Sequence, residues 1–172
     1  LMKVLFLDHD GVICLPSQWG RRFSKKSKKR GDVFDPFCPK AIKVLNEIII
    51  ATDCEIVISS DWRIYKDIEY MKNLYIDRGI IKSPIGYTNI FDIDNEDIVD
   101  ITWEYKDKTQ MLARVREKEI MDWLEKNKVA QWVAVDDLNM KKLKNFVHCS
   151  NQNEGIKKIG LKNNIISILN GS

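Results

Sequence analysis

Three short apolar runs in this chain each end in polar or acidic residues, and this pattern constrains the fold more than any other feature. Runs of this length without polar interruption are typical of strands buried on both faces, as in a parallel sheet. The runs and the residues that follow them are 4–7 before Asp8, 56–58 before Ser59, and 132–135 before Asp136 and Asp137. In open parallel sheets, ligands bind at the carboxyl ends of the strands. The pattern therefore predicts one polar site at one edge of a sheet.

Helical patterns separate these strands. Apolar residues recur at helical spacing after Pro39, and again over 64–75, 112–124 and 161–170, and Gly79 is a plausible stop signal for the second of these helices. Residues 146–149 are a fourth strand candidate. Alternating strands and helices favour βαβ units, so we expect an α/β fold with a three-layer, Rossmann-like parallel sheet flanked by helices. The length of 172 residues suits a single domain over 1–172.

Composition excludes several protein classes. The chain has no run of about 18 apolar residues, so no membrane span is expected. Its first residues are too short an apolar stretch for a signal peptide. The four cysteines, at widely spaced positions without a CxxC pair, do not suggest a disulfide framework, which favours a cytoplasmic location. We expect a monomer.

The positive charge is local. The net charge is +3, but residues 21–30 hold seven basic residues and no acid, which leaves the rest of the chain with 21 basic and 25 acidic residues. This run lies in an irregular segment, 13–37, that we interpret as a flap near the predicted site. It is either a solvated loop or a surface that attracts polyanions. Residues 80–108 show no sustained period and are expected to form a long loop or a small insertion.

The first polar strand end has a chemistry of its own. Residues i and i+2 of an extended chain point the same way, so Asp8 and Asp10 can face one cavity while His9 faces away. Gly11 permits a sharp turn after the strand. Two adjacent carboxylates repel each other and need a cation, a proton or hydrogen bonds to coexist. A hard divalent ion such as Mg²⁺ would satisfy them.

These motifs resemble those of the haloacid dehalogenase (HAD) superfamily. Residues 5–12, Leu-Phe-Leu-Asp-His-Asp-Gly-Val, are similar to its DxDG signature, 56–59 to its second motif and 132–137 to its fourth. The order matches over nearly the whole chain. The Ser-Ser-Asp-Trp-Arg stretch at 59–63 is similar to small members without a cap domain, including the phosphatase-like domains found with RNA-repair and polynucleotide-end-processing proteins.

The resemblance implies a magnesium-dependent phosphatase. Asp8 would attack phosphorus to form an aspartyl-phosphate, and Asp10 would act as acid and then base. Ser59 would bind a phosphoryl oxygen. Mg²⁺ would lie between Asp8, the main-chain carbonyl of Asp10, and either Asp136 or Asp137, so all four aspartates are candidate metal ligands.

The family also places a basic residue near the helix that precedes the last motif. Lys118 and Arg116 both qualify, and Lys118 is slightly favoured as the catalytic residue. Other candidate substrate contacts are Arg63, Arg116, Ser60 and Gly11. Asp61 is expected to cap the helix that follows it.

Neither insertion is long enough for a full cap domain, so an open site is expected. An open site suits a phosphate on a large molecule, such as a nucleic-acid end or a phosphoprotein. Two alternatives stay open: a phosphatase of small metabolites, and a non-catalytic module that binds polyanions through residues 21–30.

Overall fold

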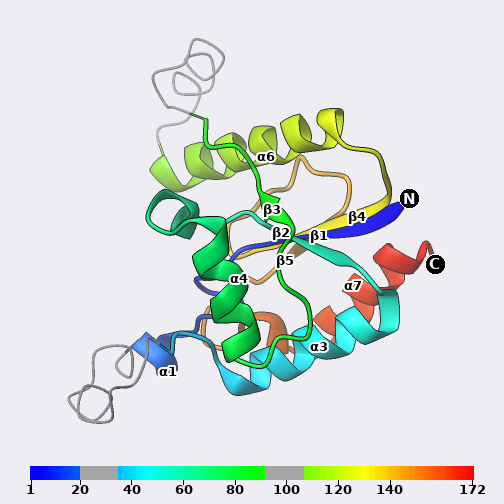
Figure 1. The fold of residues 1–172 in the computed structure, drawn as a ribbon. Coiled ribbons are helices and arrows are strands. Elements are labelled where there is room, and N and C mark those ends of the chain that lie inside the picture. The colour runs from blue at the N-terminus through cyan, green and yellow to red at the C-terminus, as the bar shows by residue number, and fades with distance from the viewer. Residues whose placement is uncertain (20–34, 92–106) are drawn as a thin grey trace.

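The computed structural model describes residues 1–19, 35–91 and 107–172, which form one α/β unit (Figure 1). The basic run 21–30 and most of the 80–108 segment lie outside the described residues. The elements follow in this order: β1 (Met2–Leu7), α1 (Pro16–Trp19), α3 (Pro39–Thr52), β2 (Glu55–Ile58), η1 (Asp61–Ile64), α4 (Ile68–Asp77), β3 (Gly86–Tyr87), α6 (Lys108–Lys126), β4 (Val129–Asp136), β5 (Phe146–His148), η2 (Gly155–Lys157) and α7 (Leu161–Asn170).

The five strands form one parallel sheet in the order β3-β2-β1-β4-β5. The chain winds from β1 outward to β3 on one side, then crosses back and adds β4 and β5 on the other side. The winding direction therefore reverses between β1 and β4. Such a switch point leaves a crevice at the carboxyl ends of the strands. The parallel sheet predicted from the apolar runs is confirmed.

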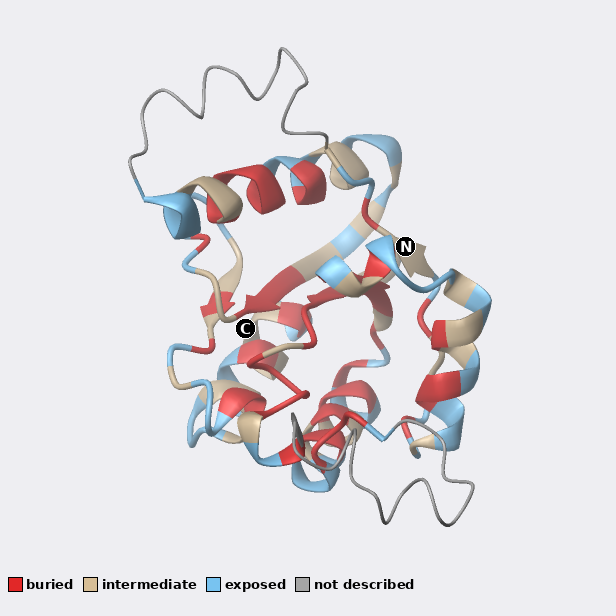
Figure 2. Ribbon diagram, turned by 90° about the vertical axis from the view of Figure 1, so that its left-hand side faces the viewer, coloured by how far each residue is buried: buried red, intermediate tan, exposed pale blue. Residues whose placement is uncertain are grey.

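Alternate residues of β1 separate two apolar cores, one on each face of the sheet. Leu5 and Leu7 pack with side chains of α3, α4 and α7, whereas Val4 and Phe6 pack with Ala113 and Ile120 of α6. Figure 1 shows α6 on one face and α3, α4 and α7 on the other, and Figure 2 shows the buried strands between these helices. The architecture has the three layers expected from the sequence.

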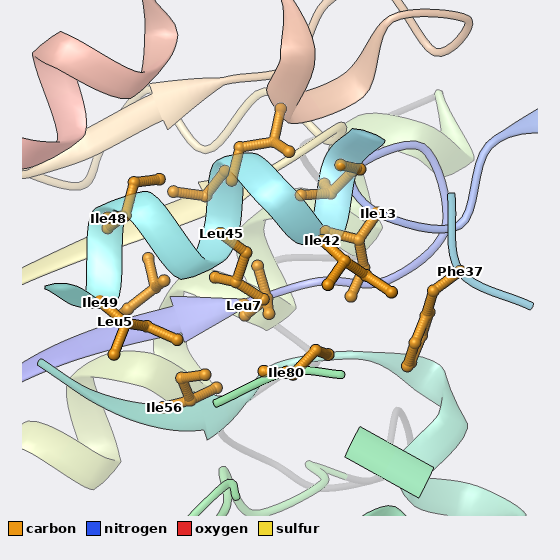
Figure 3. Packing of buried hydrophobic residues seen from close by; sticks show 14 of the residues in the cluster. Leu5, Leu7, Ile13, Phe37, Ile42, Leu45, Ile48, Ile49, Ile56 and Ile80 are labelled. Carbon is orange, nitrogen blue, oxygen red and sulfur yellow. The ribbon is translucent and has the colours of Figure 1, made fainter. Parts of the chain in front are cut away.

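In helix α3, the local sequence explains where the helix begins and ends and which of its faces is buried. Pro39 occupies its first turn, where the missing N–H of proline is tolerated, and Asp53 ends it in a left-handed conformation. Its buried apolar residues, which recur at helical spacing, are Ala41, Ile42, Leu45, Ile48 and Ile49. Leu45 and Ile49 point toward β1 (Figure 3).

The helix expected over 64–75 is divided in two. Asp67 has an extended backbone, and its side chain accepts a hydrogen bond from the Tyr70 N–H, so it caps α4 at that point. Ile64 belongs to the separate turn η1 and is exposed. The helix α4 ends at Asp77, just before Gly79, which has a φ of +84°.

Both ends of the 13–37 segment belong to the core, since Ile13, Leu15 and Phe37 are fully buried. Within 80–108, the described residues contain the two-residue strand β3 and the start of α6. All four cysteines are buried, and none of them forms a disulfide bond. Across the described part of the chain, we find no helix with the length and apolarity to cross a membrane.

The two sides of α3 give a test of this packing. Leu45 is fully buried over β1, whereas Ile50 on the same helix is 75% exposed. We expect Leu45→Ala to lower the free energy of unfolding by about 2–5 kcal/mol, because it leaves a cavity in a close-packed core. Ile50→Ala should change it by less than about 0.5 kcal/mol. Urea unfolding of both variants measures the difference, and equal losses would contradict the packing described.

Candidate active site

The register of the sheet aligns the polar strand ends. Leu7 of β1 lies opposite Ile58 of β2 and Val135 of β4. The next residue of each strand therefore reaches the same level, and the hydrogen-bond ladder continues through them. The Asp8 N–H donates to the Val135 carbonyl at 3.2 Å, and the Ser59 N–H donates to the Leu7 carbonyl at 2.9 Å.

Three carboxylates meet beside the switch point. Asp8, Asp136 and Asp137 each place a carboxylate oxygen within 4.8 Å of the other two, and the first two residues are buried. Burial raises the pKa of Asp8 well above its ordinary value, and the negative charge of Asp136 raises it further. Burial also raises the pKa of Asp136 to about 6, although Arg116 opposes the shift.

Arg116 of α6 is the positive charge beside these acids. Its Nη1 lies 3.0 and 3.1 Å from the two oxygens of Asp136 and 3.5 Å from Oδ2 of Asp8, and its Nη2 donates to Asp61 at 3.0 Å. Burial alone would lower the pKa of Arg116, but the charges of these acids raise it above its ordinary value. The guanidinium therefore stays charged and partly offsets the repulsion among the carboxylates.

The donor set fits a divalent cation. Three carboxylates and one guanidinium leave a net charge of −2 when all are ionised. Oxygen ligands of this kind are those that Mg²⁺ prefers. The raised pKa values of Asp8 and Asp136 show that Arg116 alone does not compensate the buried negative charge. Asp8, Asp136 and Asp137 could therefore hold the ion.

Gly11 makes room for one of these acids. It has a φ of +78°, and a Cβ at this position would lie 2.6 Å from Oδ2 of Asp137. Only glycine combines the left-handed backbone with that close approach. The same Asp137 oxygen accepts a hydrogen bond from the side-chain amide of Gln152 at 3.2 Å.

Ser59 offers a buried hydroxyl next to the acids. Ser59 is 1% exposed, and its Oγ has no hydrogen-bond partner within the described ranges. A buried polar atom without a partner is costly unless a ligand or water satisfies it. The hydroxyl is thus available to a bound anion at the level of Asp8.

Asp10 lies beside the three-carboxylate cluster rather than in it. Its Oδ2 accepts a hydrogen bond from Nε1 of Trp62 at 3.0 Å. His9 faces away, as expected, and its Nε2 lies 2.6 Å from the Tyr75 hydroxyl. Burial lowers the pKa of His9 to about 3, so this imidazole is neutral and structural.

Comparison of the sequence with known protein families identifies the family to which this chain belongs. Residues 4–158 match the model of the HAD domain in Swiss Army Knife RNA repair proteins. The chain belongs to this family. No curated protein and no solved structure matches it significantly. The resemblance inferred from the strand-end motifs is confirmed, and the acidic cluster of this HAD domain is consistent with a HAD active site.

The preference for Lys118 over Arg116 does not agree with the structure of the HAD domain. Lys118 is exposed, whereas Arg116 is buried against Asp8 and Asp136. Two residues along a helix differ by about 200° in direction, so both cannot face the sheet. The sequence held a signal for this choice, because Arg116 lies four residues from both Leu112 and Ile120 and so shares their apolar face.

The residues of η1 also differ from expectation. Arg63 does not face the acidic cluster, since its guanidinium is buried between Glu119 and Thr88. Ser60, expected to bind substrate, instead accepts the Trp62 N–H at 3.3 Å and caps η1. Asp61 was expected to act as that cap, but its carboxylate pairs with Arg116.

Sequence reasoning missed two further neighbours of the site. The indole N–H of Trp62 donates to Asp10. Gln152 holds Asp137 from the loop after β5. Neither contact leaves a periodic signal in the sequence, because each joins segments that are brought together only by the sheet.

Substitutions at two glycines with similar φ angles can distinguish the effect of backbone strain from the effect of crowding against Asp137. Gly79 has a φ of +84° with no atom near its missing Cβ, whereas the missing Cβ of Gly11 would overlap Asp137. Both Gly→Ala changes should destabilise the domain, by about 1–2 kcal/mol for the left-handed backbone alone. Gly11→Ala should also weaken Mg²⁺ binding in calorimetry, and Gly79→Ala should not. Unchanged Mg²⁺ affinity in Gly11→Ala would contradict this assignment.

The raised acid pKa values predict a pH dependence. Between 3.8 and about 6, the native state holds a proton on Asp136 that the unfolded state releases. The free energy of unfolding of the metal-free protein should therefore fall as pH rises through this window, and Asp8 shifts in the same direction. Mg²⁺ binds the ionised form, so its stabilising effect should grow over the same window. Melting curves with and without Mg²⁺ test this, and a pH-independent Mg²⁺ effect would refute it.

Proposed function

We propose that this HAD domain is a Mg²⁺-dependent phosphomonoesterase that removes a phosphate from the end of a nucleic acid, with Asp8 as the nucleophile. The observation that carries the proposal is the cluster of Asp8, Asp136 and Asp137 at the switch point of the sheet, in which the Arg116 guanidinium contacts the first two acids. Family membership supports phosphohydrolase chemistry, and the family's RNA-repair context supports a nucleic-acid substrate.

The side chains of the site suit two successive displacements. In the first, an oxygen of Asp8 forms a bond to phosphorus while the ester bond breaks, and Asp10 gives its proton to the leaving oxygen. In the second, Asp10 takes a proton from water, which attacks the same phosphorus and releases Asp8 and inorganic phosphate. The same aspartate serves as acid and then as base, so the proton balance closes over one cycle.

Each supporting contact fits this sequence of steps. The His9 main-chain N–H donates to Oδ1 of Asp8 at 2.8 Å and fixes the carboxylate. The Trp62 indole orients Asp10. Arg116, and the Ser59 hydroxyl that has no hydrogen-bond partner among the described residues, would bind phosphoryl oxygens. When bound, Mg²⁺ would neutralise charge on those oxygens and favour the ionised form of Asp8.

The rim of the site favours a large substrate. The side chain of Asp61, which pairs with the buried Arg116, is 66% exposed, so solvent reaches one partner of this guanidinium among the described residues. No separate cap domain is formed by the described residues. A phosphate at the end of a long molecule can therefore approach without enclosure of the rest of that molecule.

The test is phosphate release from a panel of substrates, with and without Mg²⁺. The panel holds oligonucleotides phosphorylated at the 3′ or the 5′ end, a phosphopeptide and sugar phosphates. We expect Mg²⁺-dependent release from an oligonucleotide, and a loss on the order of 10³-fold or more in Asp8→Asn, because an amide cannot act as the nucleophile. The matched control is Asp77→Asn at the exposed end of α4, which should leave turnover unchanged.

The outcomes separate the competing functions. Turnover that survives Asp8→Asn would remove Asp8 as the nucleophile. Preference for sugar phosphates would indicate a metabolite phosphatase. Salt-sensitive oligonucleotide binding without turnover of any substrate would indicate a polyanion-binding module instead.

A further inference from the structure

Two ion pairs of opposite polarity join η1 to α6. In the first, Asp61 of η1 accepts from Nη2 of Arg116 on α6 at 3.0 Å. In the second, Nη2 of Arg63 on η1 lies 3.1 and 3.2 Å from the two oxygens of Glu119 on α6. Arg116 and Glu119 are three residues apart and so share one face of the helix. The two elements are therefore linked at two adjacent points.

The two pairs differ in burial. The side chains of Arg63 and Glu119 are 2% and 4% exposed, whereas that of Asp61 is 66% exposed. An exposed ion pair is screened by water and fixes its partners weakly. A buried pair with several hydrogen bonds is costly to break, because either partner alone would be an uncompensated buried charge. The Arg63–Glu119 pair is thus the stronger constraint between η1 and α6.

The buried pair also holds the chain after β3. Nη1 of Arg63 donates to the Thr88 carbonyl at 3.1 Å and also contacts the Thr88 hydroxyl. Oε2 of Glu119 accepts the Phe91 N–H at 3.0 Å. The pair therefore connects three segments, namely the turn after β2, the turn after β3 and the middle of α6. None of these contacts involves the reacting groups.

We propose that Glu119, through its buried pair with Arg63, is a positioning residue that fixes the rotation of α6 and so holds Arg116 against Asp8 and Asp136. This inference rests on the proposed function, in which Arg116 binds the phosphoryl group. Arg116 reaches the acids from a single helix, one turn before Glu119. A small rotation of that helix would carry its guanidinium out of the 3.0–3.5 Å range that it now occupies.

Glu117 supplies a matched control. It is a buried acid on the same helix and pairs with Arg114, three residues earlier on α6. Arg114 also donates to the Asn139 carbonyl after β4 at 2.8 Å, but within the described part of the chain no hydrogen bond or ion pair of Arg114 or Glu117 reaches η1. Replacing Glu117 by Gln therefore removes a buried carboxylate from α6 without breaking the link to η1.

The experiment is a double-mutant cycle on kcat/KM and on the affinity for inorganic phosphate, measured in Mg²⁺. The single variants are Glu119→Gln, Glu117→Gln and Arg116→Met, and the double variant combines Glu119→Gln with Arg116→Met. We expect Glu119→Gln to lower both quantities by about tenfold or more, because small displacements of a charged side chain at a site have large effects. In the Arg116→Met background the same change should cost less than about twofold, since it acts only through Arg116.

Additive losses, or equal losses in Glu117→Gln and Glu119→Gln, would overturn the inference by indicating a general structural role. A crystal structure of Glu119→Gln gives a readout that does not need turnover. Arg116 displaced from Asp8 and Asp136 would support the inference, and an unchanged Arg116 would overturn it. If Glu119→Gln does not fold, Arg63→Lys takes its place, because lysine keeps the charge but cannot bind Glu119 and Thr88 together.

The two proposals fail in different ways. Absence of turnover in the wild-type protein would contradict the proposed function, while the position of Arg116 in the Glu119→Gln structure would still decide the inference. Wild-type turnover together with full activity in Glu119→Gln would leave the proposed function intact and remove the role of Glu119.

Discussion

The repulsion between buried carboxylates at the ends of β1 and β4 is the constraint on which the site depends. Asp8 and Asp136 are both withdrawn from water on neighbouring strands, and this burial raises the pKa of each. The charge of Asp136 raises the pKa of Asp8 further, and the charge of Asp137 raises both. Arg116 offsets part of this charge, and the remainder makes the cluster suitable for a divalent cation. The domain thus keeps an arrangement that costs stability, as sites that bind charged ligands commonly do.

The sheet topology determines where this charge collects. Because β1 has parallel neighbours on both sides, three strand ends reach one level, and the winding reverses between β1 and β4, where ligands bind in open parallel sheets. The apolar residues of the strands, buried between α6 on one face and α3, α4 and α7 on the other, keep that level fixed (Figure 2). The rigid core therefore positions the acids, and the turns that follow the strands supply the groups around them.

Residues at strand ends were predictable, and residues on helices were less so. A strand has a side-chain period of two, so an apolar run followed by Asp8 or Asp136 indicates both the burial and the edge at which the acid lies. For a helix, the direction of each side chain depends on how the whole helix is rotated against the sheet. Arg116 and Lys118 are close in sequence and equal in charge, and the packing of α6 brings only Arg116 to Asp8.

The amino-acid sequence alone determined the parallel α/β fold, the family and the acids at the strand ends, because these follow from local patterns of apolar and polar residues. Only the tertiary structure decided how the side chains of η1 and α6 pair. Arg63 pairs with Glu119, Asp61 pairs with Arg116, and the Trp62 indole binds Asp10. These pairs join residues 52 to 56 positions apart. Contacts across such separations follow from the docking of α6 against the turn after β2, which no local pattern encodes.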